Sequence, residues 1–197
     1  MLTERQALRR RLRRLAARQH GLFTAAQAVK IGYSHQAQKH HVDYGNWLRV
    51  ERGMFRIPEW PADEHDHLVR WTLWSGGVAV VSHATALSLH DLGDVDPPRV
   101  HLSVPASFRR SASGLVLHRQ LPPEQHVEER DGYYVTTPAR ALAECAEERM
   151  EQQWLDSAVA EALGRGLTTR RRLRDAAAEL GPAAELGVQR ALEVVGR

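Results

Sequence analysis

The segment from Gly21 to Pro58 constrains the fold more than any other part of the chain, because helix, turn and strand signals follow one another within it. Its sequence is GLFTAAQAVKIGYSHQAQKHHVDYGNWLRVERGMFRIP. Apolar residues recur first at helical spacing and then at the alternating spacing of strands. The pattern predicts two short helices followed by a β-hairpin. That order is the plan of a winged helix-turn-helix, and it points to DNA binding.

Capping signals define the two helices. Thr24 can accept a hydrogen bond from the amides of the next turn, so we predict a helix from there to about Lys30. Gly32 favours the end of this helix, and Ser34 can cap a second one that runs to about Tyr44. The connection is therefore only three or four residues long, as a helix-turn-helix requires.

The second helix is predicted to have one face that packs and one that is free to meet a ligand. Helical spacing places Ala37, His41 and Tyr44 on the packing face, with Val42 beside them. The cap and the free face supply the candidate DNA-binding residues Ser34, His35, Gln36, Lys39 and His40. Among these, we expect Gln36, Lys39 or His40 to discriminate bases in the major groove.

The predicted hairpin consists of strands at about 47–50 and 54–57, joined by a tight turn at 51–53. Its aromatic and aliphatic side chains can cover the helices; they are Trp47, Phe55 and Ile57. Its basic side chains are expected to project from the wing and neutralise phosphates; they are Arg49, Arg52 and Arg56. An arginine of the wing could also read the minor groove.

The charge of the chain is divided unevenly. Residues 1–60 hold twelve Lys and Arg against four Asp and Glu, a net charge of +8, whereas residues 61–197 carry −5, which gives +3 for the whole chain. A small helical subdomain with a hairpin could instead mediate protein contacts. However, a basic N-terminal segment followed by an acidic remainder favours binding of nucleic acid by the N-terminal segment. We therefore predict a DNA-binding domain at 1–60, a second domain at 61–197, and double-stranded DNA as a partner.

A further helix is predicted from about Thr3 to His20. Leu8, Leu12 and Leu15 form an apolar stripe along it, and arginines occupy many of the positions between them. These arginines could contact the DNA backbone, or they could form a solvated face.

The second domain is expected to be a small mixed α/β domain with a helical tail, so that the fold class of the chain is α+β. Residues 58–66 are the best candidate linker. The predicted helices and strands lie at about 63–74, 78–81, 82–90, 99–104, 115–119 and 133–135. Thr137 and Pro138 then open a helix, and the remaining sequence is helical with breaks at 164–166 and 181–182.

No enzyme motif emerges from this half, and we expect neither a metal nor another cofactor. The segment from Asp63 to His67 has the composition of metal ligands, but a His-x-His pair without a distant partner motif is typical of a solvated polar turn. His83 and His90 are interpreted as packing residues, and Cys145 as a small core residue. A nuclease that uses residues 63–67 is the least favoured alternative.

The chain has neither a run of eighteen apolar residues nor the apolar region of a signal peptide at its N-terminus. We therefore expect a cytoplasmic protein with no membrane partner.

Four downstream motifs accompany the helix-turn-helix segment in a fixed order. They are VAVVSHATALSLHDLG, VHLSVP, LVLHRQLP and DGYYVTTPARALAECA. In this combination the chain resembles the AbiEi family of antitoxins from type IV toxin–antitoxin systems. The resemblance implies a winged-helix domain that binds the operator of its own operon, a C-terminal domain associated with antitoxin activity, and a nucleotidyltransferase-like toxin as partner.

By position, the recognition helix would be 34–44, the turn 31–33 and the wing 49–56. Segments 82–87 and 136–142 look like packing signatures and not like catalytic sites. We expect a non-enzymatic repressor of its own operon that acts as an antitoxin. The alternative is a stand-alone transcriptional regulator whose second domain senses a ligand or dimerises, without a toxin. The residues leave the operator sequence and the oligomeric state open.

Overall fold

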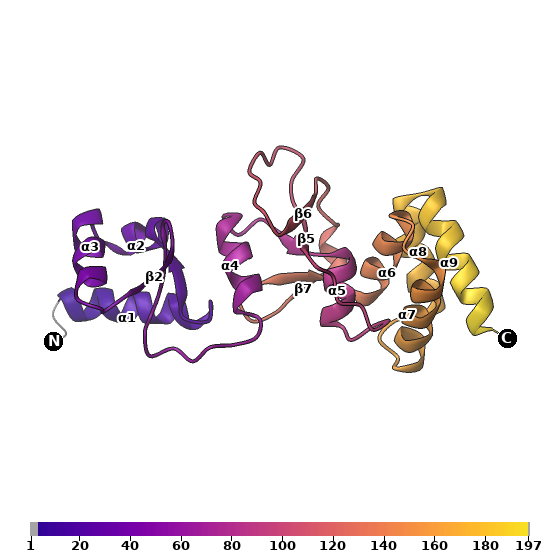
Figure 1. The fold of residues 1–197 in the computed structure, drawn as a ribbon, viewed down its shortest axis with the longest axis horizontal. Helices are drawn as coiled ribbons and strands as arrows, with labels where there is room; N and C mark the ends of the chain where they lie inside the picture. Colours follow the sequence, from indigo (N-terminus) through magenta and orange to yellow (C-terminus); the bar gives the residue numbers. More distant parts are fainter. Residues whose placement is uncertain (1–3, 197) are drawn as a thin grey trace. The chain divides into compact units, whose positions relative to one another are not determined.

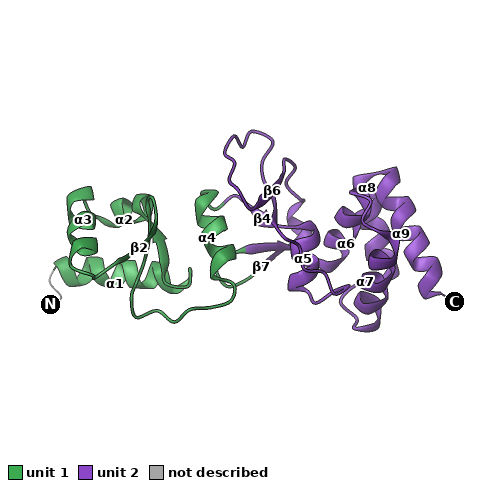
Figure 2. Ribbon diagram, in the orientation of Figure 1, with its two compact units in different colours: residues 1–77, 130–133 green, residues 78–129, 134–197 purple. Residues whose placement is uncertain are grey.

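The computed structural model describes residues 4–196, which form two compact units (Figure 2). Unit 1 comprises the described residues up to Gly77 together with Arg130–Tyr133. Unit 2 comprises Val78–Glu129 and the described residues from Tyr134 on. Thr3, the predicted start of the first helix, lies outside the described residues.

Unit 1 combines helices with a three-stranded antiparallel sheet of order β1-β3-β2 (Figure 1). In chain order its elements are α1 (Glu4–Ala17), β1 (Leu22–Thr24), α2 (Ala25–Ile31), α3 (His35–Asp43), β2 (Leu48–Glu51), β3 (Met54–Arg56) and α4 (Asp66–Trp74). The predicted helices and hairpin are present, with Gly53 in the left-handed conformation that its tight turn requires. The strand β1 was not predicted; it pairs Phe23 with Phe55 and completes the sheet.

The core of unit 1 is an aromatic cluster that joins α1, the sheet and α3. The rings of Phe23 and Trp47 meet edge to face with centroids 4.8 Å apart, and Phe55 lies 5.6 Å from Trp47. His41 of α3 stacks on Trp47 at 4.7 Å. Leu12 completes the cluster from α1, so the predicted leucine stripe and the predicted core residues of the hairpin are confirmed.

Unit 2 is a mixed five-stranded sheet with helices, so the chain as a whole is α+β as predicted. The strands are β4 (Val80–Val81), β5 (Val100–Ser103), β6 (Leu115–His118), β7 (Val127–Glu129) and β8 (Tyr134–Thr136), arranged in the order β6-β5-β4-β8-β7. β4 pairs antiparallel with β5 and parallel with β8, while β5 and β6 are parallel. β7, which the sequence did not reveal, pairs antiparallel with β8 after the short 3-10 helix η1 (Glu124–His126).

The helices of unit 2 are α5 (His83–Leu89), α6 (Pro138–Glu147), α7 (Gln152–Gly164), α8 (Arg170–Leu180) and α9 (Pro182–Val195). The helices α6 to α9 pack against one another as the predicted helical tail, and α6 also packs on α5 (Figure 1). Thr137 caps α6 and Pro138 occupies its first turn, as predicted. Cys145 is buried in α6, which confirms its interpretation as a core residue.

A buried ion pair lies at the contact of α6 with α5 and β8. Arg140 Nε donates to Glu144 Oε1 over 2.9 Å, and both side chains are almost fully buried. Burial raises the pKa of Glu144, although the hydrogen bond from Arg140 opposes this shift. The other carboxylate oxygen, Oε2, accepts from the His83 backbone amide and from Thr136 Oγ1. These bonds fix the start of α5 on α6.

Replacing the central aromatic residue of unit 1 should destabilise it strongly. We expect Phe23→Ala to lower the free energy of unfolding by about 3–5 kcal/mol, because the ring is fully buried and leaves a cavity. Tyr44→Ala is the matched control, since that ring is 73% exposed, and it should change stability by less than about 0.5 kcal/mol. Denaturant unfolding of both variants measures this, and equal losses would contradict the proposed core.

Candidate nucleic-acid interface

Side-chain caps fix the two helices and the turn between them. Thr24 Oγ1 accepts from the Gln27 amide at 3.1 Å and Gln27 Oε1 accepts from the Thr24 amide at 2.8 Å, which forms a capping box at the start of α2. Gly32, with φ 123°, ends α2, and Ser34 Oγ accepts from the Ala37 amide to begin α3. Only three residues therefore separate the two helices, and both predicted caps are confirmed.

α3 is anchored by a polar residue that the helical pattern did not assign to either face. The amide of Gln38 is buried and donates to the backbone carbonyls of Tyr33 and Ala25, both over 3.2 Å. The expected packing of Ala37, His41 and Val42 is seen. Tyr44, however, was wrongly placed on that face: it is exposed at the helix C-cap, beyond the last turn with regular helical periodicity, and stacks on His40.

The structure places most of the predicted DNA-binding residues on the surface of unit 1. Seven of the eight are exposed; they are Ser34, His35, Gln36, Lys39, His40, Arg49 and Arg52. Lys39 forms an exposed ion pair with Asp43 at 2.6 Å, and Arg49 lies over the Phe55 ring at 5.7 Å. Because an exposed ion pair is worth little in water, Lys39 can exchange it for a phosphate or a base edge.

Arg56 differs from the other seven because its guanidinium is already engaged. Nη1 is 2.7 Å from Asp66 Oδ2 of α4, and Nη2 donates to the Pro61 carbonyl at 2.6 Å. Its side chain is only 18% exposed. Arg56 thus connects β3, the central strand of the sheet, to the segment that leads into α4.

Asp66 is the centre of a polar cluster that also contains His20. Asp66 Oδ1 is 3.1 Å from His20 Nδ1, and Asp131 lies 3.5 Å from the other ring nitrogen. Burial acts to raise the pKa of Asp66, but hydrogen bonds from the Asp63 amide and Arg56 outweigh it and lower the pKa overall. Asp63 of the predicted polar turn joins this cluster, since its Oδ1 is 3.6 Å from His20 Nδ1 and accepts from the His65 amide.

A groove of about 780 Å³ runs beside α3 and brings the basic helix α1 into the same surface. Arg5, Arg9 and Arg13 of α1 line it together with Gln36 and His40 of α3. Burial lowers the pKa of His41 beneath the groove, and the nearby charges of His40 and Arg9 lower it further. This juxtaposition could not be read from the sequence, which left the role of the α1 arginines open.

Comparison with known proteins supports the resemblance in this part of the chain. Residues 10–58 match the family model described as "Transcriptional regulator, AbiEi antitoxin", and this range contains all eight candidate residues. The match confirms the resemblance for the N-terminal segment, whereas the downstream motifs lie outside it. No curated protein matches the chain.

Among solved structures, the crystal structure of RV2827C protein from Mycobacterium tuberculosis is similar, with a TM-score of 0.61 and 14% sequence identity. The alignment covers 96% of this chain and 77% of that one. At this identity the similarity shows a shared fold alone. Separately, within residues 4–196, no helix combines the length and apolar character that crossing a membrane needs.

The lowered pKa of Asp66 makes the stability of unit 1 depend on pH. A carboxyl group whose pKa is lower in the folded state stabilises the fold above its ordinary pKa of 3.8 and loses that contribution as the pH falls through the folded value. We expect the unfolding free energy of the wild type to decrease below about pH 4, and Asp66→Asn to flatten this decrease. Asp43→Asn, which removes only an exposed ion pair, should keep the wild-type profile. Parallel profiles for the wild type and Asp66→Asn in acid denaturation would contradict the assignment.

Proposed function

We propose that the chain is a winged helix-turn-helix transcriptional regulator, in which residues 1–60, as part of unit 1, bind double-stranded operator DNA and unit 2 forms an α+β antitoxin-type domain. The observation that carries this proposal is the exposed polar face of α3 next to a hairpin with exposed arginines. The match of residues 10–58 to a regulator family supports it independently.

In this proposal α3 is the recognition helix and enters the major groove. Gln36, Lys39 and His40 are exposed along it and carry donors that can meet base edges. Ser34 and His35, at the N-terminal end of α3, lie where backbone amides favour a phosphate. The positive end of the helix dipole and the hydrogen-bonding side chains thus act on the same stretch of DNA.

The wing and α1 supply the sequence-independent part of the affinity. Arg49 and Arg52 are exposed on the hairpin and are proposed to contact phosphates. Arg56 is proposed to act through the position of the wing, because Asp66 holds its guanidinium. The groove beside α3 favours a phosphate contact for Arg5 and Arg9 over a purely solvated face.

Salt dependence tests this interface. We expect binding of the chain to a labelled duplex from the promoter of its own gene to weaken steeply with salt. Arg52→Ala should lower the affinity for this duplex and for a scrambled duplex alike, and should reduce the slope of log affinity against log salt by about 1. Fluorescence anisotropy at two or more salt concentrations measures both quantities.

Two further variants complete the measurement. Arg171→Ala is the matched control, since this arginine is also exposed but lies on α8 of unit 2, and it should leave the affinity unchanged. Gln36→Ala should reduce the preference for the promoter over the scrambled duplex by about 1–3 kcal/mol while it leaves the salt slope unaltered. Absent or salt-insensitive binding by the wild type would refute the proposed interface.

We further propose that the chain is non-enzymatic, acts in the cytoplasm, represses its own operon and counteracts a nucleotidyltransferase-like toxin. The family match is to antitoxin-type regulators, which supports this role. If it holds, co-expression of the chain should restore growth to cells that produce a toxin of this class encoded beside its gene. Failure to restore growth, with DNA binding intact, would instead favour a stand-alone regulator whose second domain senses a ligand or dimerises.

A further inference from the structure

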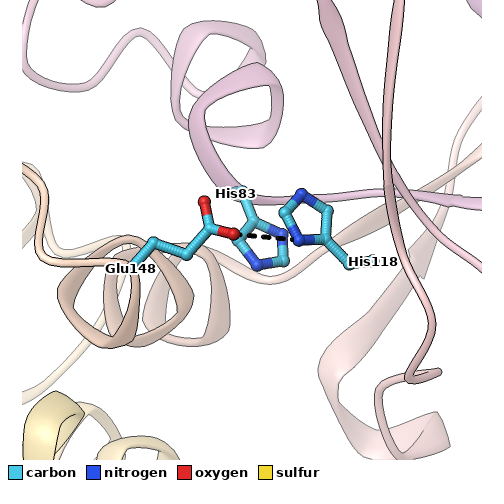
Figure 3. A group of neighbouring side chains, drawn as sticks. All are labelled: His83, His118 and Glu148. Atoms are coloured by element: carbon cyan, nitrogen blue, oxygen red, sulfur yellow. Dashed lines mark ion pairs between the residues drawn. The ribbon is translucent and has the colours of Figure 1, made fainter.

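Three side chains from separate elements of unit 2 converge at one point (Figure 3). His83 comes from the start of α5, His118 from the end of β6, and Glu148 from the C-cap of α6. Each offers one nitrogen or oxygen atom, and these three atoms all lie within 4.8 Å of one another. The closest pair is His118 Nδ1 and Glu148 Oε1, at 3.1 Å.

The Nδ1 side of the His83 ring has polar contacts that fix its position. Its Nδ1 is 2.9 Å from Ser82 Oγ and 3.7 Å from Glu144 Oε2, so Nε2 is the nitrogen left to bind a ligand. Its backbone has a positive φ of 53°, and its amide donates to the buried Glu144. A polar partner on the far nitrogen is the usual support of a metal-binding histidine, because it sets the tautomer and the orientation of the ring.

His118 likewise has a polar partner on the ring nitrogen that faces away from the proposed metal position. Its Nε2 is 3.1 Å from His101 Nδ1, so a proton on Nε2 can be donated to His101 and leave the Nδ1 lone pair facing Glu148. The side chains of His83 and His118 are only 7% and 13% exposed, so both rings are enclosed by the surrounding elements of unit 2.

We propose that His83, His118 and Glu148 bind one Zn²⁺ ion. Two histidines and one glutamate are a common ligand set for zinc sites that keep a fourth position open to water or another ligand. Glu148 is 46% exposed, so solvent reaches the site from its side. This proposal departs from the sequence-based expectation of no metal, which interpreted His83 as a packing residue because its proposed partners come from two distant segments.

Zinc binding requires a small rearrangement of the two rings. They are now stacked with centroids 3.4 Å apart and an angle of 11° between their planes. The in-plane lone pairs of parallel rings do not converge on one ion, so one ring must tilt. His83 is fixed by Ser82 and Glu144, whereas His118 is partly exposed and Glu148 more so. His118 and Glu148 therefore make the adjustment.

A second cluster of possible ligands, in unit 1, is a poorer site. It consists of His20, Asp63 and Asp66. Arg56 already neutralises Asp66 over 2.7 Å, so a metal cation would have to compete with a bound guanidinium. Glu148 instead faces His118 at 3.1 Å, and His118 is itself a proposed ligand.

The test is a titration of the full chain with Zn²⁺ alone after treatment with a chelator. Calorimetry should show saturable binding of one ion per chain, and thermal unfolding should shift to higher temperature with added zinc. Glu148→Gln should weaken zinc binding by at least about tenfold, since it removes a charged ligand. His118→Asn should do the same.

Glu147→Gln is the matched control, because Glu147 is the exposed neighbour of Glu148 and is not one of the proposed ligands; it should bind zinc like the wild type. Circular dichroism confirms that each variant folds, and if His118→Asn does not, Glu148→Gln decides alone. The proposal is overturned if the wild type shows no saturable binding. It is also overturned if Glu148→Gln retains full affinity, or if Asp63→Asn in unit 1 abolishes binding.

Discussion

The edge-to-face packing of Phe23 on Trp47 is the contact on which the candidate DNA surface depends. Phe23 lies on β1, Trp47 directly precedes β2, and His41 of α3 also stacks on the indole. The same few rings thus set the position of the recognition helix and of the wing relative to the sheet. Unit 1 is small, and small units bury little apolar surface, so the large area of an aromatic ring has a large effect. The exposed polar residues are positioned by this core and contribute little to it.

The two units use buried polar groups in different ways. In unit 1, the buried side-chain amide of Gln38 donates hydrogen bonds to two backbone carbonyls, those of Ala25 and Tyr33. These bonds hold α3 against α2 and the turn, while the opposite face of α3 stays polar and exposed. In unit 2, the Arg140–Glu144 pair joins a helix to the start of α5 and to β8. A buried ion pair of this kind is weak evidence for stability, because desolvation offsets the attraction. Here it also fixes the backbone of His83, and thereby the geometry of the histidine cluster.

Local signals made much of the fold predictable. Thr24, Ser34 and the Thr137–Pro138 pair mark helix starts through bonds to residues three positions away, so the sequence alone identifies them. The strands β1 and β7 were not predicted, because each has only three residues and is stabilised by hydrogen bonds to a partner strand distant in sequence or across a turn. Tyr44 was misplaced because helical periodicity stops before the cap.

The candidate sites show the same difference between features set by local sequence and features set by tertiary packing. The exposure of α3 follows from helical spacing, and seven of the eight predicted residues lie on the surface. The ion pair between Arg56 and Asp66 depends on the path of the chain between β3 and α4, and no local sequence pattern predicts that path. The groove with the α1 arginines and the cluster around His118 are likewise products of tertiary packing.

Unit 1 is discontinuous in sequence, and this affects how it can be isolated. Gly132 packs so closely on Val69 and on the Arg18 carbonyl that an added Cβ would lie 3.0–3.1 Å from them. Tyr133, from the same short segment, is buried. A fragment cut at residue 60 would lose Asp66, the partner of Arg56 and His20, and one cut after residue 77 would still lack residues 130–133. No single cleavage point yields the whole unit, so its properties are best studied in the uncut chain.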